Sequence, residues 1–308
     1  MMKLCYYLML FCLGIVMNCT DYESPEQLVR HSYLSSLDNT SREYYVYLPK
    51  GYYSQQDKKW PVILFLHGNG ERGNGLDELA YTRIHGPLYE AWAMKKNLPF
   101  VLIVPQLPMF GRDTLGISYL QNRSLSNVPK RLETGVPTRA PFFSGPPIQS
   151  SPMVEKFPGD LPFFSDGWNR VENDLLAILD TSLNELQIDP NRVYVTGLSY
   201  GGFGTWYMGS KHPNKFAAIA PVVAWGHPQI IPPIAKHNLP IWVFAGGKDL
   251  TVEKKYFYKG MAMLESLGHT KMQFTIHEDL GHDAWKRVYS GDELYNWLLS
   301  HSLKDSND

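Results

Sequence analysis

The sequence predicts an α/β fold in which a mostly parallel central sheet is flanked by helices. Short apolar runs recur at residues 62–66, 101–104, 193–196, 217–223, 241–244 and 272–276. Several are continuous rather than alternating, which is typical of strands buried on both faces of a parallel sheet. Amphipathic stretches at 171–186, 253–267 and 293–300 separate or follow these runs. Strands that alternate with helices favour right-handed crossovers into one twisted sheet.

The first element of the sheet is expected to be a hairpin. Residues 31–37 and 44–48 are strand-like, and they flank the sequence D-N-T-S at 38–41. Asp, Asn and Ser favour turns because their side chains hydrogen-bond to nearby backbone groups. The hairpin would give the sheet an antiparallel edge.

Composition and charge limit the possible functions. The 308 residues have a net charge of −1, so the positive surface typical of nucleic-acid-binding proteins is not expected. The cysteines, Cys5, Cys12 and Cys19, all lie near the N-terminus. The rest of the chain can therefore hold no disulfide or thiolate metal site. We expect residues 19–308 to form a single domain stabilised by its core.

Residues 1–18 have the features of a secretory signal segment. Lys3 precedes an apolar run over residues 4–17, which is too short to span a bilayer as a helix. Cys19 ends this run in the manner of a bacterial lipoprotein signal, although Asn18 stands where a small residue is usual. Cys19 is either lipidated and attached to a membrane or incidental to a plain signal peptide. Both alternatives predict a protein outside the cytoplasm.

A long insertion interrupts the alternation of strands and helices. Residues 107–165 show neither periodicity and contain nine of the 22 prolines, together with the aromatic pairs 142–143 and 163–164. Loops of this length inside a domain are often functional. The insertion could cover an active site and set substrate choice, or it could be a flexible surface segment, and the aromatic pairs favour a cover.

A nucleophile motif follows the strand predicted at 193–196. Residues 197–201 are G-L-S-Y-G, and a helix can begin directly afterwards. A serine on a sharp turn between a strand and a helix is the nucleophile elbow, which lifts the hydroxyl above the sheet. Side chains at Gly197 and Gly201 would collide with the adjoining strand and helix. The motif indicates Ser199 as a nucleophile.

A catalytic serine needs a base and an orienting carboxylate, which follow it in this order along the chain. Asp249 comes after the strand predicted at 241–244, and His282 comes after the last predicted strand, preceded by Gly281. We expect Asp249 to be the acid and His282 the base. Asp279 or Asp283 could replace Asp249, although both are close to His282 in sequence.

The oxyanion of an acyl-transfer reaction requires backbone N–H donors. One donor is expected from Tyr200, which follows the nucleophile. The loop after the strand predicted at 62–66 has the sequence H-G-N-G-E-R-G, and Asn69 is expected to supply the other. His67 is expected to hold this loop by hydrogen bonds rather than to transfer a proton.

The run at 66–73, L-H-G-N-G-E-R-G, resembles the signature of an esterase and peptidase group of α/β-hydrolases. This group is related to dienelactone hydrolases, feruloyl esterases and prolyl-oligopeptidase catalytic domains. Further matches are H-G-P at 85–87, V-P-Q at 104–106, Trp168, D-P-N-R-V-Y at 189–194 and G-H-D-A-W at 281–285. The resemblance implies the α/β-hydrolase fold and hydrolysis of carboxylic esters without a metal or organic cofactor. The insertion departs from the pattern of the group.

Three functions are therefore compatible with the sequence. The first is an extracytoplasmic serine hydrolase that cleaves small or polymer-linked esters through an acyl-enzyme. The second is a serine peptidase of the prolyl-oligopeptidase type, although no repeats of a gating propeller are visible. The third is a non-catalytic binding protein with a hydrolase fold, which the presence of Ser199, Asp249 and His282 in the expected order disfavours.

Overall fold

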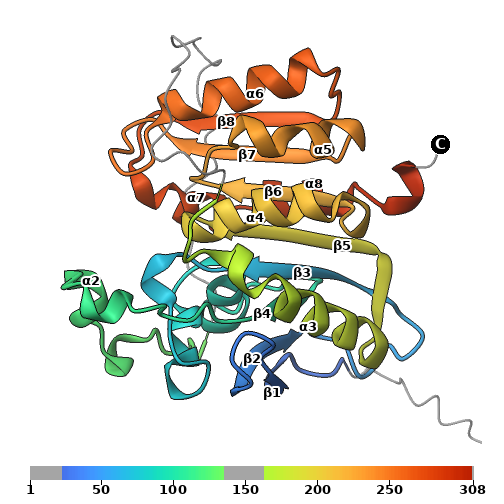
Figure 1. The fold of residues 1–308 in the computed structure, drawn as a ribbon. Coiled ribbons are helices and arrows are strands. Elements are labelled where there is room, and N and C mark those ends of the chain that lie inside the picture. Colours follow the sequence, from blue (N-terminus) through green and yellow to red (C-terminus); the bar gives the residue numbers. More distant parts are fainter. Residues whose placement is uncertain (1–22, 135–162, 307–308) are drawn as a thin grey trace, which may run out of the picture.

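One eight-stranded sheet forms the centre of the molecule (Figure 1). The computed structural model describes residues 23–134 and 163–306, so the predicted signal segment and Cys19 lie outside the described residues. The strands are β1 (Gln27–Leu34), β2 (Ser41–Leu48), β3 (Trp60–Leu66), β4 (Val101–Val104), β5 (Ile188–Leu198), β6 (Ala218–Val222), β7 (Ile241–Gly246) and β8 (Met272–His277). Their order is β1-β2-β4-β3-β5-β6-β7-β8.

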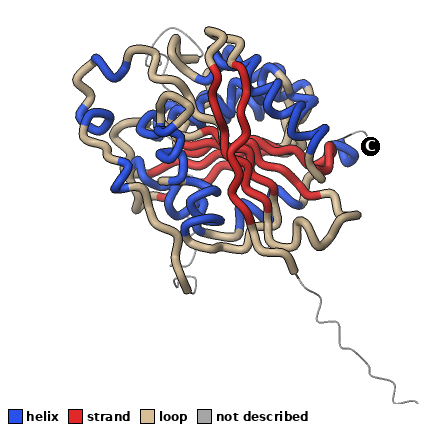
Figure 2. Tube along the Cα trace, turned by 90° about the horizontal axis from the view of Figure 1, so that it is seen from below, coloured by secondary structure: helices blue, strands red, loops and turns tan. Residues whose placement is uncertain are grey.

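The pairing of the strands confirms the predicted fold class. β1 pairs with β2, and β2 with β4, in antiparallel orientation, while every later pair is parallel. The strands fan out across the sheet (Figure 2), as the right-handed twist of β-structure requires. From β3 the chain passes to β4 on one side, and β5 lies on the other side of β3. Crevices that bind ligands form where the strand order reverses in this way, beyond the carboxyl ends of the strands.

Helices cover both faces of the sheet and bury two separate cores. Alternate residues of a strand face opposite sides, so Leu64 and Val195 belong to one core and Phe65 and Tyr194 to the other. The first core is covered by α3 (Glu172–Glu185), α4 (Tyr200–Lys211), α5 (Ile231–Lys236) and α6 (Phe257–Ser266), which lie in front of the sheet in Figure 1. The second is covered by α1 (Gly86–Leu88), α7 (Trp285–Ser290) and α8 (Glu293–Leu299).

Two predicted elements are shifted along the sequence. The first strand was expected at 31–37 but ends at Leu34, because the next two residues bond to α3 instead of continuing the ladder. The Ser35 hydroxyl donates to Asp174 Oδ2 over 2.5 Å, and the Ser36 N–H donates to Oδ1 over 2.7 Å. The helix expected from residue 253 begins at Phe257, since Glu253 has a ψ of 135° and only a 3₁₀ turn lies between them.

The described flanks of the insertion form two limbs: residues 107–134 leave the α/β core, and residues 163–167 return to it. The outgoing limb contains two short 3₁₀ turns and α2 (Ser118–Gln121), which projects from the body of the molecule in Figure 1. The returning limb reaches a 3₁₀ turn at Trp168–Val171 and then α3. Among the residues described in the structure, no helix is long and apolar enough to cross a membrane.

Candidate active site

Ser199 occupies a strained turn between β5 and α4. Its φ of 51° and ψ of −117° lie outside the common regions for residues with a side chain, as is typical of strain stored at functional sites. The turn is held in place because the Ser199 N–H donates to the Val222 carbonyl over 2.9 Å and the Ser199 carbonyl accepts from the Phe203 N–H over 3.0 Å. The hydroxyl is thereby presented at the carboxyl end of the sheet.

The glycines beside Ser199 are required by close packing. A Cβ atom at Gly201 would overlap the carbonyl oxygen of Leu66 on β3 and lie 2.7 Å from that of His67. A Cβ atom at Gly197 would meet the carbonyl oxygens of Gly201 and Leu66. These obstacles are backbone atoms, which cannot rotate away. The steric requirement inferred from the motif is therefore present in the structure.

The structure brings Ser199, His282 and Asp249 together, although they come from three different loops. His282 Nε2 lies 3.0 Å from Ser199 Oγ, and His282 Nδ1 lies 2.7 Å from Asp249 Oδ2. A carboxylate only accepts hydrogen bonds, so Nδ1 carries the ring proton and Nε2 is left as an acceptor facing the hydroxyl. The Ser199 O–H consequently donates to His282, which is the arrangement that proton abstraction needs.

Asp249 is fixed from both sides. Its side chain is fully buried, and its Oδ1 accepts from the N–H groups of Thr251 and Val252, each over 2.8 Å. The alternatives considered for the acid point elsewhere. Asp279 forms two hydrogen bonds with Arg287, and Asp283 pairs with Lys286.

The turn before His282 is shaped by a different glycine from the one expected. Gly281 has a φ of −89°, and the nearest atom to a Cβ there would lie 3.9 Å away, so a side chain would fit. At Gly246, where β7 ends, a Cβ atom would collide with the Gly281 carbonyl oxygen. Close approach of these two loops therefore depends on Gly246, which no sequence motif indicated.

His67 holds the loop after β3, as predicted. The ring is fully buried, with Nε2 accepting from the Leu107 N–H over 2.9 Å and Nδ1 2.7 Å from the Gly68 carbonyl. Burial lowers the pKa of His67 to about 3, so the ring is neutral at physiological pH. A neutral imidazole with both nitrogens engaged serves as a brace for the loop.

Asn69 and Tyr200 each begin a helix. Asn69 is the first residue of the 3₁₀ turn Asn69–Glu71, and Tyr200 is the first residue of α4. The N–H groups at the start of a helix have no acceptor within the helix. The Asn69 side chain is occupied, because its Oδ1 accepts from Arg72 Nε over 2.6 Å and its Nδ2 donates to the Tyr119 hydroxyl over 2.5 Å.

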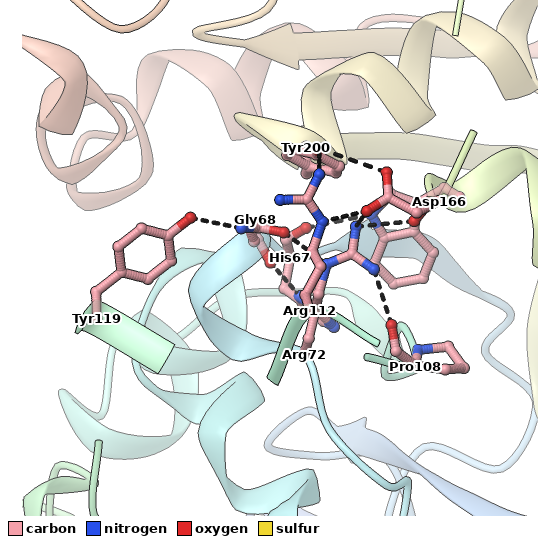
Figure 3. A network of polar contacts seen from close by, with 10 residues as sticks. His67, Gly68, Arg72, Pro108, Arg112, Tyr119, Asp166 and Tyr200 are labelled. Carbon is pink, nitrogen blue, oxygen red and sulfur yellow. Dashed lines mark hydrogen bonds and ion pairs between the residues drawn. The ribbon is translucent and has the colours of Figure 1, made fainter. Parts of the chain in front are cut away.

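A polar network beside these residues was not predicted (Figure 3). Its centre is Arg72, whose side chain is fully buried and donates to the carbonyl oxygens of Pro108 and Asp166, each over 2.8 Å. Arg112 pairs with the Asp166 carboxylate and donates to the Tyr200 hydroxyl. Arg72 lies in the G-E-R-G motif, but Arg112 lies within the insertion and Asp166 directly after it, 54 residues apart, so no sequence signal joins them.

The rest of the described structure adds no metal centre. Within residues 23–134 and 163–306, no three His, Cys, Asp or Glu side chains are grouped so that they could hold a metal ion.

Comparison with known proteins finds similarity to hydrolases. A model of the prolyl oligopeptidase family matches residues 167–227, which include Ser199. A thermostable esterase of known structure superposes with a TM-score of 0.60 at 23% identity, covering 89% of this chain and 63% of its own. The chain has the α/β-hydrolase fold. This result confirms the fold that the motif resemblance implied.

Two further relatives extend the comparison. The fluorophosphonate-binding serine hydrolase F of Staphylococcus aureus superposes on this hydrolase-fold chain with a TM-score of 0.54 at 13% identity, covering 90% of this chain and 98% of its own. Poly(3-hydroxyalkanoate) depolymerase C of Paucimonas lemoignei is 40% identical over 68 residues, which make up 21% of this chain and 15% of that protein.

Proposed function

We propose that this protein is a serine hydrolase that cleaves carboxylic esters through an acyl-enzyme, with Ser199 as nucleophile, His282 as base and Asp249 as the orienting acid. The observation that carries the proposal is the continuous hydrogen-bonded chain from Ser199 Oγ through His282 to Asp249, with distances of 3.0 and 2.7 Å. The fold and the names of the structural relatives support the same reaction class.

In the acylation step, Ser199 Oγ attacks the ester carbonyl carbon while its proton passes to His282 Nε2. The backbone N–H groups of Asn69 and Tyr200 receive the oxyanion of the tetrahedral intermediate. When the intermediate collapses, the carbon–oxygen bond to the alcohol breaks and His282 returns the proton to the departing oxygen. Water then attacks the acyl-enzyme by the same route, which regenerates Ser199 and releases the acid.

Asp249 supports both steps by stabilising the imidazolium form of His282 and holding its tautomer. Each proton and electron pair in the sequence is handled by these side chains, the two backbone donors and water. The proposed reaction therefore uses no metal or organic cofactor.

We propose an extracytoplasmic location for this reaction, on the basis of the signal-like segment at 1–18. Lipidation of Cys19 would attach the protein to a membrane, whereas a plain signal peptide would release it. The proposed substrates are small-molecule or polymer-linked esters.

A serine peptidase is the second candidate, because the matching family model at residues 167–227 is that of the prolyl oligopeptidases. The same triad can open a peptide bond, so the experiment must compare the two substrate classes. Purified protein should be assayed with p-nitrophenyl esters of increasing acyl length, feruloyl esters and peptide p-nitroanilides, with Ser199→Ala as the matched control. Ester hydrolysis that needs Ser199 and exceeds anilide hydrolysis supports the proposal. Preferential hydrolysis of the anilides would favour the peptidase.

A further inference from the structure

The side chain of Tyr200 is enclosed by groups from the two limbs of the insertion. Its ring stacks on Phe164 with a centroid distance of 4.4 Å and an interplanar angle of 17°. The Arg112 guanidinium lies 4.9 Å from the ring centroid, and its Nη2 also donates to the Tyr200 hydroxyl. The hydroxyl lies 3.5 Å from Asp166 Oδ1 (Figure 3). Arg112 comes from the outgoing limb, and Phe164 and Asp166 from the returning limb.

Arg72 joins this cluster to the loop that carries Asn69. Its guanidinium lies 4.8 Å from the Tyr200 ring centroid, donates to the Asp166 carbonyl over 2.8 Å and donates to Asn69 Oδ1 over 2.6 Å. Both residues whose N–H groups are proposed to hold the oxyanion are therefore tied to one network. The network needs side chains from both limbs to be complete.

The charges of the network favour a stable arrangement. Burial opposes ionisation of Asp166, but its hydrogen bond from Arg112 and the charges of Arg72 and Arg112 outweigh this effect and lower its pKa. Burial lowers the pKa of Arg72 to about 10, which still leaves the guanidinium charged at pH 7. Burial and the charge of Asp166 raise the pKa of Tyr200, so its hydroxyl stays neutral. Two cations and one carboxylate thus surround a neutral phenol.

We propose that the Arg112–Asp166 ion pair is a positioning unit that fixes Tyr200, and through it aligns the backbone donor that stabilises the oxyanion. The inference rests on the proposed function and goes beyond it, because it assigns a positioning role to two side chains outside the triad, one within the insertion and one directly after it. Tyr200 directly follows Ser199, so movement of its side chain is transmitted to the N–H at the start of α4.

The size of the effect follows from the geometry of oxyanion holes. Complete loss of one donor typically lowers kcat by about 10²- to 10³-fold. The Arg112–Asp166 pair holds the donor indirectly, and Phe164 and Arg72 remain to restrain the ring. We therefore expect Arg112→Gln and Asp166→Asn each to lower kcat by about 10- to 100-fold, with KM changed by less than about threefold, since ground-state binding is not involved.

A transition-state analogue separates positioning from a purely structural role. A trifluoromethyl ketone with the acyl group of the best ester adds to Ser199 as a hemiketal oxyanion, so its Ki depends on the oxyanion donors. In Arg112→Gln and Asp166→Asn, Ki should rise by the same factor by which kcat/KM falls. The double variant should lose little more than either single variant, because each single substitution already breaks the Arg112–Asp166 ion pair. Arg112→Lys keeps the positive charge but cannot contact the Asp166 carboxylate and the Tyr200 hydroxyl in the same geometry. It should therefore lower kcat less than Arg112→Gln does.

The matched control is Arg192→Gln. Arg192 pairs with Asp189 in a similarly half-buried ion pair, with Nε 2.7 Å from Oδ2, at the start of β5 and away from the network. It should leave kcat and Ki unchanged. If Arg112→Gln and Asp166→Asn keep the wild-type kcat, or lower it without raising Ki in parallel, the positioning role is wrong. Ser199→Ala distinguishes failure of the positioning role from failure of the proposed function, because hydrolysis that survives this substitution contradicts the proposed function itself.

Discussion

Replacement of Asp249 by asparagine tests the hydrogen bonding that sets the tautomer of His282 in the proposed triad. The carboxylate accepts three hydrogen bonds, two from the N–H groups of Thr251 and Val252 and one from His282 Nδ1. An asparagine in the same place keeps the two backbone bonds only if its oxygen faces them. Its NH₂ group then faces His282 Nδ1, which must become an acceptor, so the ring proton moves to Nε2 and the base can no longer accept from Ser199.

The expected loss can be worked out from these bonds. To restore the working tautomer, the amide must flip and point its NH₂ group at two buried N–H donors. Each buried donor left without an acceptor costs about 1–3 kcal/mol, so the flip, which leaves two of them, costs about 2–6 kcal/mol. At 1.36 kcal/mol for each factor of ten, kcat should fall by about 30-fold to 2 × 10⁴-fold.

The assay is steady-state hydrolysis of a p-nitrophenyl ester, with circular dichroism to check that Asp249→Asn folds. Asp279→Asn and Asp283→Asn are the matched controls, because both carboxylates are close to His282 in sequence but pair with Arg287 and Lys286. These controls should stay within about threefold of the wild-type kcat, since their ion pairs are exposed. If Asp249→Asn keeps nearly the wild-type kcat while Asp279→Asn or Asp283→Asn loses most of it, the assignment of the acid is refuted.

Three further predictions concern stability and location. Burial raises the pKa of Glu71 from 4.5 to about 7, so the contribution of Glu71 to the unfolding free energy should decline between about pH 4.5 and 7. In Glu71→Gln this contribution is absent, so the difference in unfolding free energy between variant and wild type, measured by urea denaturation, should change by on the order of 3 kcal/mol across that window. A difference that stays constant with pH would contradict the prediction. Gly201→Ala should lower the unfolding free energy by at least about 1–3 kcal/mol, because the added Cβ meets backbone atoms. In the same urea assay, Gly70→Ala should change the unfolding free energy by less than about 0.5 kcal/mol, because its Cβ meets nothing within 4 Å. If Cys19 is lipidated, Cys19→Ser should move the protein from the membrane fraction to the soluble fraction, since each buried CH₂ of a lipid anchor contributes about 0.8 kcal/mol; an unchanged distribution would leave the plain signal peptide.

The fold and the three residues of the proposed triad could be predicted because each depends on local sequence. The strands are short apolar runs, and the G-x-S-x-G pattern is visible within five residues, although the Leu66 and His67 carbonyls that exclude a side chain at Gly201 lie far away in sequence. Asp249 and His282 each follow the end of a strand, and parallel strands present their carboxyl ends at one edge.

The parts that could not be predicted depend on contacts between distant segments. The end of β1 is set by Asp174 of α3, which is 139 residues from Ser35. The pairing of Arg112 with Asp166 joins two limbs that no periodic pattern relates. Short helices such as α1 and α5 have too few turns to produce a periodic signal.

The most direct test of the central claim is to find which residue becomes covalently modified. The protein should be treated with a fluorophosphonate probe, digested and mapped by mass spectrometry, with Ser199→Ala and His282→Ala treated in parallel. We predict a single adduct on the peptide that contains Ser199, no adduct in Ser199→Ala and a labelling rate reduced by at least about 10³-fold in His282→Ala. An adduct on another serine, or labelling that persists in Ser199→Ala, would contradict the proposed nucleophile and the mechanism built on it.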